Sequence, residues 1–220
     1  MLGPAKTIGK TPFRDILELE PAHYLYYKKG KIKNGCYWRL EAKDFTDNMS
    51  QAQEHTHFLV TDAIKRQLVS DVPICTFLSG GLDSSIISRV ASDYMNDRGA
   101  VLDTYSVDYK DNDKYFESSL FQPNKDSDYI GLISSYIDSD HHNIVLNNTD
   151  VADALIESTF ARGYPGFTDV DSSLLLFCKE VVKNHKVALS GECADEIFGG
   201  YPWYHRKEIL FENTFPWSRT

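Results

Sequence analysis

Apolar and polar positions follow two alternating periods from about residue 70 onward. Short apolar runs rich in β-formers lie at 72–78, 102–109, 141–146 and 186–190. Stretches with helical spacing lie between and after them, at about 84–95, 127–138, 150–160, 171–184 and 194–198. Strands and helices that alternate at this spacing predict an α/β domain with a parallel sheet and helices on both faces. Ligands of such sheets bind at the carboxyl ends of the strands.

The first forty residues have a different pattern. Residues 13–40 are rich in β-formers, with Gly30 and Gly35 as turn signals, which predicts a small antiparallel hairpin or meander. The stretch "FTDNMS" at 45–50 then offers capping residues before a long helical pattern that reaches Leu68. We therefore expect a small β-rich unit ahead of the α/β domain.

Composition narrows the classes of function. A chain of 220 residues with 42% hydrophobic residues can bury a core, and one large domain with a small appendage is expected. The net charge of −9 disfavours nucleic acid as a partner, and the apolar runs are too short to cross a membrane. No apolar leader is visible and the cysteines lack zinc-site spacing, so we expect reduced thiols in a cytoplasmic protein. The cysteines are Cys36, Cys75, Cys178 and Cys193.

The first strand end with unusual chemistry is "FLSGGLDSS" at 77–85. Gly80 and Gly81 let the backbone approach a ligand, and the following helix start supplies free N–H groups and hydroxyls that bind anions. No G-x-x-x-x-G-K-[ST] string exists, so this is not a Walker A loop. Asp83 would repel a phosphate unless it holds Mg²⁺. The alternative is a tight turn in which Asp or Ser only caps the helix.

The second is "VALSGECADEIFGGY" at 187–201. Asp195 and Glu196 would complement the dipole of the next helix, and Gly199 with Gly200 would act as a C-cap; these structural roles are the alternative to a site. Together with the first loop, however, Asp83 and Asp195 could jointly bind the Mg²⁺ of a nucleoside triphosphate. Glu192 would then be free to act as a general base on an attacking amine.

The two strings together resemble a known family. "LSGGLDSS" is similar to the pyrophosphate loop of the PP-loop ATP pyrophosphatases, which have an adenine nucleotide alpha hydrolase-like fold. With "LSGECADEIFGGY" and the strand "YSVDYKDND", the chain resembles the synthetase domain of glutamine-hydrolysing asparagine synthetases. The resemblance implies adenylation of the aspartate β-carboxylate by MgATP with release of pyrophosphate, followed by attack of ammonia to give asparagine and AMP.

The resemblance also implies roles for individual residues. Those expected to contact adenosine, largely through the backbone, are Phe77, Leu78, Ser79, Gly80 and Val107. Those expected to hold pyrophosphate and the metal are Ser79, Gly81, Asp83, Ser84 and Ser85. Ser190 and Gly191 would line the nucleotide and the aspartyl-adenylate. Glu192 would be the base or a substrate-orienting carboxylate, and Asp195 the second metal ligand.

The family pattern further implies the domain organisation. Residues 1–44 would be a β-rich remnant from the end of a glutaminase domain, and 45–220 an ATP-pyrophosphatase domain that is incomplete at its C-terminus. The chain starts Met1-Leu2, whereas glutaminases of the family need an N-terminal cysteine nucleophile, so glutamine hydrolysis is not expected. Cys193 stands where the family more usually has glycine.

Several readings stay open at this level. The chain could be another PP-loop amide-forming ligase, similar to β-lactam synthetase, or a nucleotide-binding fragment without turnover. The stretch 161–173 either borders the aspartate pocket, through Arg162, Asp169 or Asp171, or is a solvated loop. Apolar surface left by missing parts would favour self-association, for example as a homodimer. His141 and His142 are expected to be structural.

Overall fold

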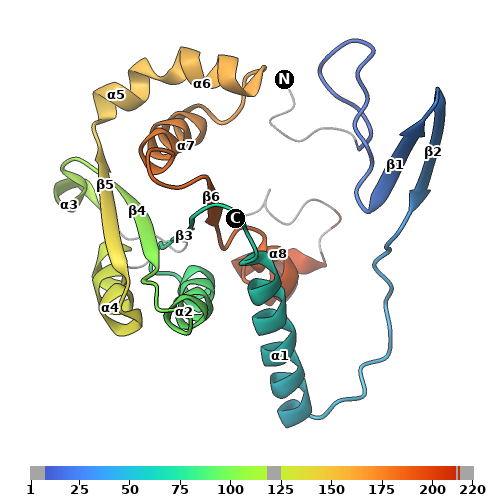
Figure 1. The fold of residues 1–220 in the computed structure, drawn as a ribbon, viewed down its shortest axis with the longest axis horizontal. Helices are drawn as coiled ribbons and strands as arrows, with labels where there is room; N and C mark the ends of the chain where they lie inside the picture. The colour runs from blue at the N-terminus through green and yellow to red at the C-terminus, as the bar shows by residue number, and fades with distance from the viewer. Residues whose placement is uncertain (1–7, 118–124, 212, 214–220) are drawn as a thin grey trace.

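The computed structural model describes residues 8–117, 125–211 and 213 (Figure 1). Its main sheet has four parallel strands in the order β5-β4-β3-β6. These strands are β3 (Ile74–Phe77), β4 (Asp103–Tyr109), β5 (Asp140–Leu146) and β6 (Val187–Leu189). All four were predicted from the apolar runs, and their parallel pairing confirms the α/β class.

Helices cover both faces of this sheet. Helices α1, α2 and α4 lie on one side, and α5, α6 and α7 lie on the other (Figure 1). The helices are α1 (Met49–Gln67), α2 (Leu82–Asn96), α3 (Asn112–Tyr115), α4 (Ser127–Ile137), α5 (Asn148–Asp153), α6 (Leu155–Arg162), α7 (Thr168–Val181), α8 (Ala194–Phe198), α9 (Pro202–His205) and α10 (Lys207–Leu210). Within the described residues, none of these helices combines the length and the apolar character needed to cross a bilayer.

Strand β3 divides the core into two layers. Ile74 packs with buried side chains of α1 and α2, whereas the next residue, Cys75, packs with Tyr105 and with Phe177 of α7. This alternation follows from the period of two along a strand. The apolar run needs no polar face because both sides of a parallel sheet are covered.

A two-stranded antiparallel sheet precedes the α/β region. Strand β1 (His23–Lys28) pairs with β2 (Lys31–Cys36), and the register Lys28↔Lys31 leaves a two-residue turn. Both turn residues, Lys29 and Gly30, have positive φ, as tight hairpin turns of the favoured type require. The predicted hairpin is thereby confirmed within the described residues; the predicted unit's first seven residues lie outside them.

Element boundaries differ from the sequence prediction in several places. Strand β3 ends at Phe77 rather than Leu78, α2 begins at Leu82 rather than Ser84, and α7 begins and ends earlier than 171–184. The single helix predicted at 150–160 is two helices, α5 and α6. They meet at Ala154, whose ψ of −6° interrupts the regular helical ladder and whose side chain is buried. Apolar spacing alone continues across such a break and does not reveal it.

Three serines spaced four residues apart fix α2 to its surroundings. Ser84, Ser88 and Ser92 are all buried on one face of the helix. The Ser88 hydroxyl is 2.7 Å from Thr76 Oγ1 of β3, and the Ser92 hydroxyl donates to the Ile137 carbonyl at the end of α4, 2.6 Å away. Ser84 contacts the loop that leads into the helix. We call this row the serine seam.

The α1–α2 layer yields a test of the core. Leu102 belongs to this layer and is 1% exposed, whereas its neighbour Val101 is 59% exposed. We expect Leu102→Ala to lower the free energy of unfolding by about 2–5 kcal/mol, because it leaves a cavity among buried side chains. Val101→Ala, the matched control, should change it by less than about 0.5 kcal/mol. Urea denaturation measures both, and similar losses in the two variants would contradict this assignment of the core.

Candidate functional site

Two loops meet at the carboxyl edge of the sheet. One follows β3 and leads into α2, and the other follows β6 and leads into α8. The pairing Thr76↔Leu189 brings the ends of the two strands level. A Cβ placed on Gly191 would lie 3.1 Å from Asp83 Cβ and 3.2 Å from the Ser84 backbone nitrogen. The loops are therefore in contact, and only a residue without a side chain fits there comfortably.

The first loop (78–85) is held by its own hydroxyl groups. Ser79 Oγ lies 3.0 Å from Ser84 Oγ, and the Ser84 and Ser85 hydroxyls both donate to the Gly81 carbonyl. Gly80 has a φ of 78°, and a Cβ there would lie 2.8 Å from the Asp126 carbonyl oxygen. Glycine is thus required at position 80 by conformation and by space.

The same loop leaves the start of α2 open. The N-cap residue is Gly81, which has no side chain, and no side chain of a described residue makes a capping hydrogen bond there. The alternative in which Asp or Ser merely caps this helix is therefore not what the structure has. The N–H groups of the first helical turn and the positive end of the dipole face the loop, as in anion sites.

The second loop (190–193) is also a tight turn. The Glu192 backbone N–H donates to Ser190 Oγ at 3.1 Å. Cys193 is the N-cap of α8 and has a φ of 71°, a left-handed conformation that favours glycine. Gly199 ends the helix with a φ of 69°, so the predicted C-cap is present there. The expectation that the family usually has glycine at 193 would therefore have a conformational reason.

A cavity of about 230 Å³ lies between the two loops. Its lining residues are Phe77, Ser79, Asp83, Ser190, Gly191, Glu192, Cys193, Asp195 and Tyr201. Most of the predicted site residues are thereby brought together. Leu78, Gly80, Gly81, Ser84 and Ser85 support the loop without lining this cavity.

Three carboxylates line the cavity, and their like charges repel one another. Burial raises the pKa of Asp83 above its ordinary value, and the charge of Asp195 raises it further. A carboxylate whose ionisation is opposed by burial and by a neighbouring charge, next to open helix N–H groups, suits a hard divalent cation that travels with a phosphate anion. The residues present therefore fit Mg²⁺ bound to a polyphosphate.

Tyr201 is a cavity residue that the sequence patterns did not single out. Its hydroxyl donates to Glu196 Oε1 at 3.0 Å. This hydrogen bond raises the pKa of Tyr201 to about 12, with further contributions from burial and from nearby negative charge. The phenol thus stays a neutral donor between carboxylates. The sequence feature that could have identified Tyr201 as a site residue is its position at the end of "EIFGGY", directly after the acidic loop.

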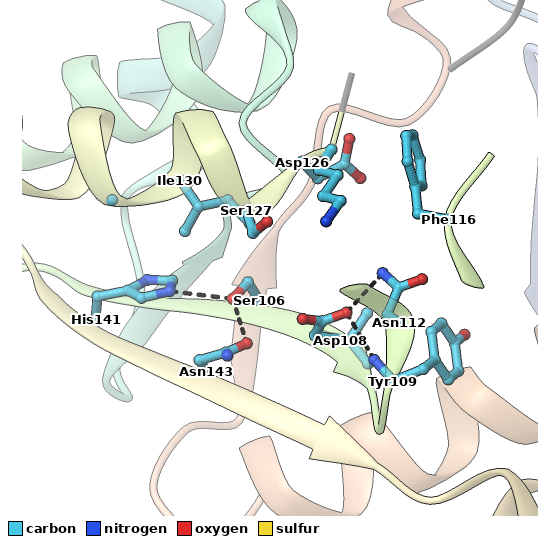
Figure 2. Close-up of a pocket in the computed structure, with 13 residues that line it drawn as sticks. Ser106, Asp108, Tyr109, Asn112, Phe116, Asp126, Ser127, Ile130, His141 and Asn143 are labelled. Carbon is cyan, nitrogen blue, oxygen red and sulfur yellow. Dashed lines mark hydrogen bonds between the residues drawn. The ribbon is translucent and has the colours of Figure 1, made fainter. Parts of the chain in front are cut away.

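Val107 lies on a separate cavity of about 360 Å³ next to β4, β5 and α4. Figure 2 shows the Ser106 hydroxyl between His141 and Asn143 in this cavity; its distance to His141 Nε2 is 3.0 Å. Burial lowers the pKa of His141, so the imidazole is held neutral within this network. Of the residues predicted to contact adenosine, the structure thus places Val107 and Phe77 on two different cavities.

The stretch 161–173 holds an ion pair. Arg162 Nη1 contacts both carboxylate oxygens of Asp171, at 2.7 and 2.8 Å. This pair connects the end of α6 to α7. The Asp169 side chain lies outside the described residues.

The fold and the paired loops define an α/β protein with an open helix N-terminus and an acidic turn at neighbouring strand ends. The asparagine synthase family model matches residues 55–219, which is more than half of the chain. The chain therefore belongs to the asparagine synthase family.

Two glutamine-hydrolysing asparagine synthetases agree with this assignment. Glutamine-hydrolyzing asparagine synthetase 3 of Bacillus subtilis is 47% identical over 220 residues, which are 100% of this chain and 36% of that protein. Asparagine synthetase B of Escherichia coli is 28% identical and matches 88% of this chain and 35% of its own. A solved NAD⁺ synthetase from Burkholderia pseudomallei overlaps 70% of this chain and 57% of its own, at 15% identity and a TM-score of 0.38. The chain spans little more than a third of the two synthetases.

The raised pKa of Asp83 predicts a pH-dependent penalty. The folded chain binds the Asp83 proton more tightly than the unfolded chain, so ionised Asp83 destabilises the fold at neutral pH, and this penalty fades as pH falls through the raised pKa toward the ordinary value of 3.8. In metal-free buffer, Asp83→Asn should therefore have a higher Tm than the parent chain at pH 7, with the difference vanishing near pH 4. Asp71→Asn, an exposed control, should show no such trend. A Tm difference independent of pH would contradict the assignment.

The left-handed conformation of Cys193 predicts a stabilising substitution. Cys193→Gly should raise the free energy of unfolding by up to about 1 kcal/mol, because the Cβ that opposes positive φ is removed. Cys193→Ala keeps a Cβ and should show no gain. Chemical denaturation of the three proteins under reducing conditions provides the comparison, and an equal gain in both variants would attribute the effect to the thiol instead.

Proposed function

We propose that this chain carries the ATP-dependent step that converts aspartate to asparagine through a β-aspartyl-AMP intermediate with release of pyrophosphate. The observation that supports this most strongly is the cavity shared by the two loops. It combines the Ser79 and Ser190 hydroxyls next to an open helix start, suited to a polyphosphate, with three carboxylates, suited to its metal and to proton transfer. Membership of the asparagine synthase family supports the choice of substrates.

Binding of the nucleotide would rest on the first loop. The open N–H groups at the start of α2 would receive the β- and γ-phosphates, with the Ser79, Ser84 and Ser85 hydroxyls beside them. The backbone near Phe77 and Val107 would contact adenosine. Because these groups lie on two cavities along adjacent strands, the nucleotide would extend across the ends of β3 and β4.

Asp83 and Asp195 would hold Mg²⁺. When bound, this ion would neutralise charge on the departing pyrophosphate. It would also relieve the repulsion between these two carboxylates, which adds to the effect of burial in raising the pKa of Asp83. Ser190 and Gly191, on the opposite loop, would line the aspartyl-adenylate.

Glu192 would act on the second substrate. It lines the cavity at the turn after β6, where its carboxylate could orient the attacking ammonia or accept its proton. Tyr201 would form part of the same wall, held in place by the hydrogen bond that its hydroxyl donates to Glu196. The reaction would gain most from holding the two substrates in line, since little other chemistry is required of the protein.

The proposed organisation is a β-rich segment at 1–44 from the end of a glutaminase domain and an ATP-pyrophosphatase domain at 45–220. Aspartate and ammonia would be the substrates of the second part. Two alternatives stay in view: a nucleotide-binding fragment without turnover and another PP-loop amide-forming ligase.

Incubation of the 220-residue chain with MgATP, aspartate and ammonium tests the proposal. We expect aspartate-dependent release of pyrophosphate and formation of AMP and asparagine in equal amounts. Glu192→Gln should lower the rate at least about 100-fold, since a general base contributes about 10²–10⁴. The Glu192→Gln variant should still be stabilised by MgATP in a thermal shift assay. Glu54→Gln, an exposed substitution on α1, serves as the control and should keep the parent rate.

The outcomes separate the alternatives. Stabilisation by MgATP without aspartate-dependent release of pyrophosphate would support the alternative of a nucleotide-binding fragment without turnover. Pyrophosphate release that requires a different carboxylic acid would indicate another ligase of the class. Failure of MgATP to stabilise the parent chain at all would contradict the nucleotide site itself.

A further inference from the structure

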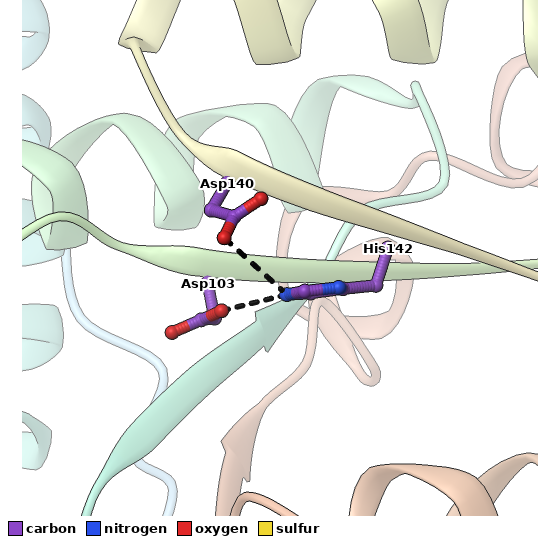
Figure 3. Close-up of side chains that lie close together, drawn as sticks. All are labelled: Asp103, Asp140 and His142. Carbon is purple, nitrogen blue, oxygen red and sulfur yellow. Dashed lines mark hydrogen bonds and ion pairs between the residues drawn. The ribbon is translucent and has the colours of Figure 1, made fainter.

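A second group of ionisable side chains lies at the opposite, amino edge of the sheet. Asp103 is the first residue of β4, and Asp140 is the first residue of the neighbouring β5. His142, two residues further along β5, directs its Nε2 atom at both carboxylates (Figure 3). The distances from Nε2 are 2.7 Å to Asp103 Oδ1 and 4.0 Å to Asp140 Oδ2. One ligand atom from each of the three residues lies within 4.8 Å of the others.

The parallel register explains why these side chains converge. Asp103 pairs with Asp140, and Tyr105 pairs with His142, so positions two apart on β5 point to the same face as Asp103. The Tyr105 ring stacks on the His142 ring with centroids 4.6 Å apart, which fixes the plane of the imidazole. Spacing within the sequence could not reveal the group, because Asp103 comes from another strand.

A buried histidine, His185, contacts the second carboxylate oxygen of Asp103. His185 Nε2 lies 3.3 Å from the other Asp103 oxygen, Oδ2, and the Tyr105 hydroxyl lies 3.1 Å from His185 Nδ1. His185 is only 7% exposed. A carboxylate that faces outward with one oxygen and is oriented through the other by a buried histidine is the arrangement that outer-shell groups give to metal ligands.

The charges of the group are not balanced by its own members. Asp140 and one oxygen of Asp103 face a single imidazole nitrogen of His142, which can donate at most one proton to them, while His185 lies against the other oxygen of Asp103. Among the described residues, no lysine or arginine makes an ion pair with Asp103 or Asp140. A bound cation at this edge would remove the excess of negative charge.

We propose that Asp103, Asp140 and His142 form a site for a divalent transition metal, with Zn²⁺ as the representative ion. One imidazole nitrogen and two carboxylate oxygens are ligands that Zn²⁺ accepts in tetrahedral sites with water in the fourth position. A nitrogen ligand favours such ions over Mg²⁺ and Ca²⁺, which prefer oxygen alone. The site joins the amino ends of β4 and β5, whereas the cavity lined by Asp83, Glu192 and Asp195 lies at the carboxyl edge of the sheet.

Calorimetric titration of the metal-free, reduced chain with Zn²⁺ tests this site. All titrated proteins carry Asp83→Asn, because removing this carboxylate weakens any metal binding in the cavity at the carboxyl edge of the sheet. We expect one Zn²⁺ per chain, with the Kd raised at least about tenfold by His142→Gln and by Asp140→Asn, and by about tenfold by His185→Gln. Mg²⁺ in place of Zn²⁺ should give no comparable heat. Asp71→Asn should leave the Kd within a factor of two.

Two further readouts keep the test decisive. Co²⁺ should bind in place of Zn²⁺ and give a visible absorption spectrum that His142→Gln abolishes. Asp140 has a side chain that is 70% exposed, so Asp140→Asn should fold even where a histidine variant does not, as circular dichroism would verify. Absence of Zn²⁺ binding, or binding that survives both Asp140→Asn and His142→Gln unchanged, would overturn the proposal. In the latter case the exposed cysteines Cys178 and Cys193 would be the ligands to examine.

Discussion

The candidate site depends on the double pairing of strand β3. This strand has only four residues, yet it is hydrogen-bonded in parallel to β4 on one side and to β6 on the other. Because β6 comes from late in the sequence, this pairing alone brings the acidic turn beside the glycine-serine loop. The same pairing buries Ile74 and Cys75 in two separate core layers, so the fold and the site share one structural element.

At the carboxyl edge of the sheet, features suited to a ligand lower the stability of the chain without one. Three carboxylates line one cavity, and the pKa of Asp83 is raised by burial and by Asp195. A fold selected for stability alone would separate such charges or pair them with cations. The left-handed Cys193 beside them adds backbone strain in the same turn. Unfavourable features gathered in one place are expected where a ligand later compensates them.

The sequence predicted the fold class and most of the residues that line the cavity, because both are local. Short apolar runs mark buried parallel strands, and the glycine and serine positions of a phosphate loop follow from backbone conformation. What it did not predict depends on geometry that the spacing of apolar residues does not encode. The break at Ala154 and the orientation of Tyr201 toward Glu196, five residues away, are set by local backbone conformation. The meeting of Asp103 with His142 depends on the pairing of β4 with β5. The separation of Val107 from Phe77 on two cavities likewise depends on contacts between strands.

The serine seam has a consequence for how a ligand would be bound. Serine side chains are short, so α2 packs near the sheet, and each of their hydrogen bonds is directional. A slide of the helix by a fraction of a turn would break the Ser88 and Ser92 bonds together and leave buried hydroxyls unsatisfied. The first turn of α2 is therefore fixed in position before any anion arrives. A ligand that binds there pays little entropy to order its receptor, and more of the contact energy contributes to affinity.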